Sequence, residues 1–269
     1  MNYNEALEFI HSRMKFGSQP GMERISALCE AFDNPQDNLK YVHVAGTNGK
    51  GSTCTMIAKM LEAAGYKVGL FTSPFVVDFR ERIQINSQMI PQQDFADIVA
   101  KIVPVIEELK KKNIEPTEFE IITAAAFLYF SQEKCDIVVL EVGLGGTLDS
   151  TNIIKKSEVS VITSISMDHT DILGDSILEI AAHKCGIFKE GGHVVGYPQP
   201  DFAVERFVKE KAKESGCNYT HSDLGRIRLV LEEFDGSTII YAGCTFKIPL
   251  AGKHQIYNFS TAISAINVL

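Results

Sequence analysis

The segment 41–53, with the sequence YVHVAGTNGKGST, constrains the fold of this chain more than any other part. Its first residues suit a buried strand, and its three glycines let the backbone turn tightly and expose N–H groups. Lys50 adds a positive charge, Ser52 and Thr53 supply hydroxyls, and a helix is expected from about Thr53 to Ala64. Amide donors, a helix dipole and an ammonium then converge on one anion. The segment predicts a phosphate-binding turn, and we expect it to bind a nucleoside triphosphate, ATP.

The turn departs from the usual P-loop pattern in one respect. The usual pattern has serine or threonine directly after Gly-Lys, whereas Gly51 here separates Lys50 from Ser52. The alternative is a glycine-rich connection between a strand and a helix that binds nothing. The phosphate site is favoured because strand, turn, lysine and hydroxyls occur together and in the expected order.

Composition places the chain among ordinary globular proteins. It has 269 residues, 45% hydrophobic and 22% charged, which is enough for one large or two small domains. No run of residues approaches the length of a membrane span, and the N-terminus has no signal-peptide pattern. The six cysteines form no Cys-x-x-Cys pair, so neither a zinc site nor a disulfide framework is indicated. We expect a cytoplasmic protein with reduced thiols and no membrane partner.

The net charge of −8 argues against nucleic acid as a partner, since no basic stripe or arginine-rich segment is present. If the ligands are anionic, a few local cationic side chains and metal ions would have to neutralise their charge. The chain therefore fits a binder of small molecules.

Strands and helices alternate along most of the chain, which predicts an α/β fold with a doubly wound, mostly parallel sheet. We expect helices at 4–14, 22–32, 92–111 (kinked at Pro104), 118–132, 176–183, 201–215 and 256–269, with a loop at 17–21. Strands are expected at 40–45, 67–71, 82–86, 136–140, 159–163 and 193–196. From about 217 to 250 the chain predicts a small antiparallel β segment, with strands at 226–231, 237–241 and 245–250 and a hairpin turn at Asp235-Gly236.

Polar residues follow several of these strands, at the sheet edge where open α/β folds bind ligands. Ser73, Glu141 and His169 fall on the same edge as the phosphate turn. A hydroxyl, a carboxylate and an imidazole, completed by water and phosphate oxygens, could hold Mg²⁺. Two of these residues have another explanation, since Ser73 could be a turn residue and His169 a core histidine with its hydrogen bonds satisfied. Glu141 is harder to explain without a ligand, because a carboxylate directly after an apolar strand would otherwise be buried and unpaired.

The order of the motifs resembles that of folylpolyglutamate synthases and dihydrofolate synthases, which belong to the Mur ligase superfamily. The resemblance runs from the first helix to the last residue. It rests on the phosphate turn 46–52, Ser73-Pro74, Glu81-Arg-Ile83, Glu141 to Gly146, Leu148-Asp149, Thr151-Asn152, Asp168-His-Thr170, Lys184 with Gly186-Ile187, and the segment 252–258.

The resemblance implies an ATP- and Mg²⁺-dependent amide ligase that adds L-glutamate to a folate or dihydropteroate carboxylate through an acyl phosphate. Lys50, His169 and Lys184 would be catalytic, and Lys184, which by itself reads as a surface lysine, would be carbamylated. Positions matching family nucleotide contacts are Asn48, Gly49, Lys50, Gly51, Ser52 and Asn258; metal ligands are Ser73, Glu141 and His169. Substrate contacts are Thr117, Glu118, Phe119, Glu120, Thr147, Leu148 and Asp149, with 22–25 nearby.

The resemblance also implies one ATP-binding Mur-ligase-like domain over residues 1–269, with the family's C-terminal ligase domain absent, and a monomeric state. Two residues depart from the family: Thr147 replaces a common bacterial arginine, and His183 replaces a common acidic residue beside Lys184. The sequence leaves open dihydrofolate synthesis, polyglutamylation or both. Two other functions also stay open: a Mur-type ligase for another substrate, and an ATP-binding module without turnover.

Overall fold

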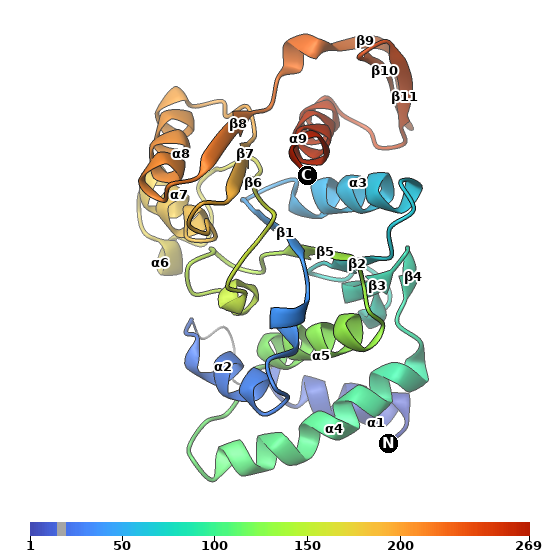
Figure 1. Cartoon of the computed structure of the whole chain (residues 1–269), viewed down its shortest axis with the longest axis vertical. Coiled ribbons are helices and arrows are strands. Elements are labelled where there is room, and N and C mark those ends of the chain that lie inside the picture. Colours follow the sequence, from blue (N-terminus) through green and yellow to red (C-terminus); the bar gives the residue numbers. More distant parts are fainter. Residues whose placement is uncertain (15–19) are drawn as a thin grey trace.

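The computed structural model describes residues 1–14 and 20–269, in which a mostly parallel sheet lies between layers of helices (Figure 1). The sheet has eight strands in the order β4-β3-β2-β5-β1-β6-β7-β8. The five strands at its centre run parallel and are buried: β2 (Val68–Phe71), β5 (Ile137–Glu141), β1 (Tyr41–Ala45), β6 (Val159–Ile162) and β7 (His193–Gly196). This confirms the predicted doubly wound fold.

The strands at both edges extend this core. The short strands β3 (Ile83–Ile85) and β4 (Gln88–Met89) add an antiparallel hairpin beyond β2. At the other edge, β8 (Asn218–His221) pairs in parallel with β7. The prediction that an antiparallel segment starts near 217 was therefore wrong at its beginning, because these residues complete the main sheet.

Alternation along the strands sends side chains to two faces, and helices cover both (Figure 1). Val42 and Val44 of β1 face α3 (Lys50–Ala63) and α9 (His254–Val268). On the opposite face, Tyr41 contributes to a core with α5 (Glu118–Gln132), and Ala45 to one with α7 (Ile177–Cys185) and α8 (Phe202–Glu214). Because the central strands are parallel, the loops that follow them meet at one edge of the sheet, at the carboxyl ends of the strands.

A further helical layer packs on α5. It contains α1 (Tyr3–His11), α2 (Glu23–Glu30) and α4 (Gln92–Lys110), whose apolar residues extend the same core. Pro104 lies inside α4, which continues on both sides of it. The loop predicted at 17–21 lies mostly outside the described residues.

The small antiparallel sheet consists of β9 (Ile227–Glu233), β10 (Gly236–Tyr241) and β11 (Cys244–Ile248) and packs on α9. The β9–β10 turn is Phe234-Asp235, one residue earlier than predicted, because Gly236 already pairs with Glu233. Short helical turns occur at η2 (Pro35–Asn38), η3 (Phe79–Arg82), η4 (Ser150–Ile153), α6 (Thr170–Leu173) and η5 (Leu224–Arg226). No helix in the described ranges is long and apolar enough to cross a membrane.

Candidate functional site

The phosphate turn leads directly into α3, which begins at Lys50, three residues earlier than predicted. Gly49 precedes the helix with a φ of 82° and offers no side-chain cap. Within the described chain, the N–H groups of Lys50, Gly51 and Ser52 therefore have no acceptor, and the first helical bond is from Thr53 N to Gly49 O, at 2.9 Å. Uncapped amides at the positive end of a 14-residue helix are suited to binding an anion.

Two glycines of the turn are required by close packing. Gly46 has a φ of 153°, and a Cβ there would lie 1.9 Å from Thr163 Oγ1. A Cβ on Gly49 would lie 2.5 Å from Oδ1 of the buried Asn258 on α9. Asn258, predicted as a nucleotide contact, is thus packed against the turn, and its Nδ2 donates to Gln255 Oε1 at 3.0 Å.

The turn is also fixed to the loop after β6. The backbone N–H groups of Thr47 and Asn48 both donate to Ser164 O, at 2.7 and 3.2 Å. The Asn48 side chain donates to Ser166 Oγ at 3.3 Å, and Thr47 Oγ1 to Ser166 O at 3.1 Å. Because the same loop continues to His169, these bonds tie the phosphate turn to the segment that carries one of the predicted metal residues.

Two lysines converge on one carbonyl oxygen of the turn. Lys50 Nζ donates to Gly46 O and Thr47 O, both at 3.1 Å, and Lys184 Nζ donates to Gly46 O at 2.9 Å. Lys184 is 2% exposed, so the prediction from local sequence of a surface lysine was wrong. Burial and the nearby Lys50 charge lower the pKa of Lys184 to about 8. A buried amine with this pKa has a reactive neutral form near physiological pH.

Glu141 ends β5 and is 3% exposed beneath the turn. Its Oε2 accepts a hydrogen bond from Ser73 N at 3.1 Å, and Gly51 lies directly above it. Burial raises the pKa of Glu141 to about 7, although Lys50 and the Ser73 N–H oppose this. No cationic side chain in the described ranges lies within 4.0 Å of it, so the carboxylate and the Ser73 hydroxyl fit the demand of a hard divalent cation.

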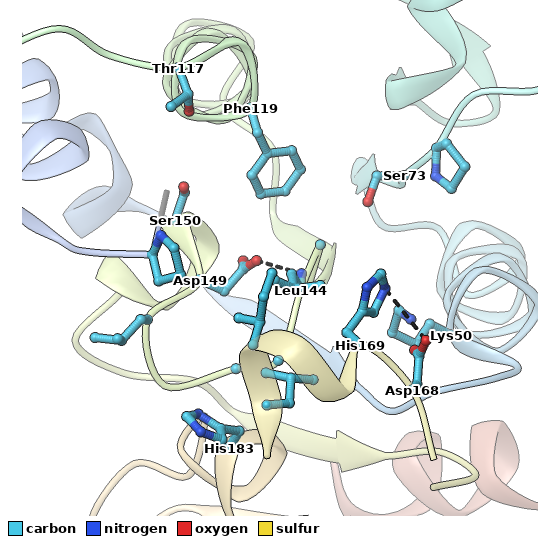
Figure 2. Close-up of a pocket in the computed structure, with 18 of the residues that line it drawn as sticks. Lys50, Ser73, Thr117, Phe119, Leu144, Asp149, Ser150, Asp168, His169 and His183 are labelled. Atoms are coloured by element: carbon cyan, nitrogen blue, oxygen red, sulfur yellow. Dashed lines mark hydrogen bonds and ion pairs between the residues drawn. The ribbon is translucent and has the colours of Figure 1, made fainter. Parts of the chain in front are cut away.

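His169 precedes α6 with a left-handed φ of 46°. Its Nε2 lies 3.6 Å from Asp168 Oδ1, and Figure 2 shows the imidazole across an open space from Ser73. The described residues contain no cluster of three His, Cys, Asp or Glu side chains that could hold a metal. The backbone N–H of Ser73 thus bonds Glu141 directly. Ser73 and His169 both line the cavity described next, whereas Glu141 is not among its lining residues.

A cavity of about 590 Å³ adjoins the turn. Thr47, Lys50, Ser73 and His169 line it beside the phosphate turn. Its remaining walls come mostly from the start of α5, the glycine-rich loop after β5 and the loops around α6 and α7 (Figure 2), with further residues from η3 and from between α1 and α2. They include Met14, Pro20, Arg82, Thr117, Glu118, Phe119, Ile122, Gly143, Leu144, Gly145, Gly146, Leu148, Asp149, Ser150, Asp168, Ile172 and His183.

Of the predicted substrate residues, five line the cavity: Thr117, Glu118, Phe119, Leu148 and Asp149. Phe119 packs over Gly143, where a Cβ would lie 2.5 Å from its ring. Leu148 is 46% exposed at the cavity wall, which leaves an apolar side chain available to a ligand.

Two predicted substrate residues have structural partners instead. Glu120 caps α5 together with Thr117, accepting from Thr117 N at 2.7 Å, and forms an ion pair with Arg24 at 3.0 Å. Thr147 packs against α7, where its backbone N–H and its hydroxyl both donate to His183 O, at 2.9 and 3.2 Å. Neither residue lines the cavity, nor does the segment 22–25.

Asp149 has a mixed role. It lines the cavity, yet its buried carboxylate accepts from Leu144 N at 2.8 Å and Thr151 N at 2.9 Å, which fixes the glycine-rich loop. Burial raises the pKa of Asp149, and these donors oppose the rise. The next partner, Thr151, also bonds His43 Nε2 at 2.9 Å, so the network reaches into the sheet.

Sequence reasoning missed the cavity position of Arg82. The residue appeared only inside a matched motif, without a role, because its half-exposed strand gave no sign that it lines the cavity. Pairing of the β2 and β3 strands brings it there, with Thr72 N donating to Arg82 O at 3.1 Å.

Comparison with known proteins decides the family. Residues 44–266 match the Mur ligase middle domain. The chain belongs to the Mur ligase middle-domain family. It is 47% identical over 195 residues to the dihydrofolate synthase/folylpolyglutamate synthase of Bacillus subtilis, covering 72% of this chain and 45% of that protein. It is 39% identical over 283 residues to the folylpolyglutamate synthase of Lacticaseibacillus casei, covering 100% of this chain and 64% of that protein.

The fold agrees with this membership of the Mur ligase family. A solved FPGS–AMPPCP–folate complex superposes with a TM-score of 0.90 at 37% identity, covering 100% of this chain and 67% of that one. The similarity to folylpolyglutamate and dihydrofolate synthases expected from the motifs is thus confirmed. The chain spans about half to two thirds of the length of the curated relatives it matches.

Proposed function

We propose that this chain carries the nucleotide- and pterin-binding part of an ATP-dependent amide ligase that adds L-glutamate to a folate, to dihydropteroate, or to both. The observation that carries the proposal is the cavity that joins an uncapped phosphate turn to an apolar wall built by Phe119 and Leu148. A triphosphate and a flat aromatic acid could lie side by side in it. The names of the relatives support the same reaction, and one solved neighbour holds AMPPCP and folate.

The residue roles follow from this arrangement. The N–H groups from Asn48 to Ser52 that remain free would bind ATP phosphates, with Lys50 beside them and Asn258 supporting the turn from α9. Thr117, Glu118, Phe119, Leu148 and Asp149 would contact the pterin, whereas Glu120 and Thr147 would hold the walls in place.

Ser73, Glu141 and His169 would hold Mg²⁺, which supplies charge neutralisation on the transferring phosphoryl group when bound. The buried carboxylate of Glu141 and its hydrogen bond to Ser73 N support this set. Lys184 would be carbamylated, since its amine is buried with a lowered pKa, and the neighbouring His183 also lines the cavity.

The reaction would proceed in two steps. A carboxylate oxygen of the pterin acid attacks the γ-phosphorus of ATP, the bond to the β-phosphate oxygen breaks, and ADP leaves an acyl phosphate behind. The amine of glutamate then attacks the acyl carbon, loses a proton, and displaces inorganic phosphate. The turn and Lys50 would position and stabilise the transferring phosphoryl group, so no nucleophilic side chain is needed.

The test is ADP formation by the chain with Mg-ATP and glutamate, with and without dihydropteroate or tetrahydrofolate. ADP formation that requires the pterin acid and disappears in Lys50→Ala supports the ligase. Binding of Mg-ATP without any ADP formation would instead favour a nucleotide-binding module that needs further domains. A panel that includes other carboxylate acceptors separates a folate ligase from a Mur-type ligase for another substrate.

A further inference from the structure

Arg82 is a cavity-lining cation that the proposed function has not used. It ends η3 and lies where β3 begins to pair with β2, so its backbone is beside Thr72 and one residue from Ser73. Its side chain lines the cavity together with Lys50 and Ser73. The position is therefore close to where phosphate and metal are proposed to bind.

The guanidinium of Arg82 is held by aromatic rings. Its Cζ lies 5.3 Å from the centroid of the Phe75 ring and 5.4 Å from that of Phe79. Such contacts fix the plane of the guanidinium and remove part of its hydration. A cation held in this way loses little conformational entropy when it binds an anion.

Apart from these ring contacts, the guanidinium has no hydrogen-bond or ion-pair partner among residues 1–14 and 20–269. Its Nε is buried without a hydrogen bond, and no carboxylate of that part of the chain lies within 4.0 Å. Arg80, two residues earlier, is instead paired within the protein, because its Nη2 lies 2.7 Å from Asp78 Oδ2. A buried, unpaired donor on a charged group is costly, which points to an anionic ligand for Arg82.

The electrostatic surroundings agree. Burial lowers the pKa of Arg82, and the more distant Glu118 and Glu141 oppose that shift without pairing with it. Glu118 also lines the cavity, and its Oε2 is buried without a hydrogen bond. That oxygen lies 3.8 Å from His11 Nδ1, so of these two residues only Arg82 has a buried polar atom without a hydrogen-bond or ion-pair partner.

We propose that Arg82 binds the carboxylate of the pterin substrate, the group that would attack ATP; this rests on the proposed function. Lys50 and the amides of α3 already serve the phosphates, whereas the planar fork of arginine matches a carboxylate through two parallel hydrogen bonds. The two reactants are both anions, so a fixed cation in the same cavity as Lys50 and Ser73 lowers their mutual repulsion. It also orients one carboxylate oxygen toward the phosphate turn.

The test compares two ligands in four proteins. Binding of dihydropteroate and of its carboxamide analogue, which lacks the charge, is measured by calorimetry for the wild type, Arg82→Gln, Arg82→Lys and Arg80→Gln. Circular dichroism verifies that each is folded. Arg80→Gln is the matched control, since it removes the same charge from the same turn but outside the cavity.

The expected result is a loss of about 10- to 100-fold in affinity for the acid in Arg82→Gln, the range for charge-assisted hydrogen bonds, with carboxamide binding unchanged. Arg82→Lys should recover part of the loss, and Arg80→Gln should bind both ligands like the wild type. Equal weakening of acid and carboxamide, or no weakening in folded Arg82→Gln, would overturn the assignment while leaving the proposed function intact. Binding of neither ligand to the wild-type chain would overturn the proposed function and this inference with it.

Discussion

Replacing Gly49 by alanine tests whether the shape of the phosphate turn is what creates the anion site. The residue has a φ of 82°, which costs an L-residue about 1–2 kcal/mol. The new Cβ would also lie 2.5 Å from Oδ1 of Asn258, so the turn, α9 or the buried Asn258 side chain that supports the turn must move by about 1 Å to reach ordinary contact distance. Because the free amides of α3 follow directly, that movement misdirects them.

The substitution Gly65→Ala separates the cost of a left-handed backbone from the effect of the clash with Asn258. Gly65 has a φ of 92° at the other end of the same helix, and a Cβ there meets nothing within 4 Å. It should lower the free energy of unfolding by about 1–2 kcal/mol and leave nucleotide binding unchanged. Gly49→Ala should lose at least as much stability and, in addition, at least about 10-fold in affinity for Mg-AMPPCP, since a misplaced charge-assisted hydrogen bond is worth about 1.5–3 kcal/mol.

Urea unfolding gives the stabilities and calorimetry gives the affinities of the two variants. If folded Gly49→Ala binds Mg-AMPPCP as tightly as Gly65→Ala does, the shape of the turn does not create the site, and the reasoning fails.

Three further changes have definite expected outcomes. Burial, with a smaller contribution from Lys189, lowers the folded-state pKa of His43 to about 3, so the unfolded state binds the proton first and stability falls as pH drops below about 6.5. Urea unfolding should show the wild type losing about 3 kcal/mol more than His43→Gln between pH 7 and pH 4, and parallel curves would contradict this. Thr117→Ala should lower the free energy of unfolding by about 1 kcal/mol and Thr117→Ser by much less, because the hydroxyl caps α5; equal losses would exclude the cap as the cause. Incubation with ¹³C-bicarbonate should give a carbamate NMR signal that is absent in Lys184→Arg, and a signal that persists in the variant would place the modification elsewhere.

The phosphate turn and the central strands could be predicted because their signals are local. The alternation of buried strands with helices gave the sheet, and residues at strand ends gave Ser73 and Glu141. The sequence of β8 carries no apolar run, since it is an edge strand with exposed ends, and so its pairing with β7 was missed. The position of β8 in the sheet is set by α8, which packs on the sheet and returns the chain to a place beside β7.

The roles of single residues were harder to predict than the elements. Glu120 was expected to contact the substrate; the structure shows it in the capping box with Thr117 and paired with Arg24, outside the cavity lining, and its role toward the substrate stays a prediction. Lys184 looked exposed because it is a lysine near the end of a short helix, whereas the Gly46 carbonyl it reaches is 138 positions away. The position of the Arg82 side chain is set by the pairing of β2 with β3 and by contacts with two aromatic rings, and a local sequence pattern reports neither.

The most direct test of the account is a calorimetric titration of Mg-AMPPCP and dihydropteroate, separately and together, into the wild-type chain and Lys50→Ala. We predict one site for each ligand in the wild type, binding of both at once, and loss of the nucleotide alone in Lys50→Ala. Mutually exclusive binding, or nucleotide binding that survives Lys50→Ala unchanged, would contradict the claim that this cavity brings a triphosphate and a pterin acid together.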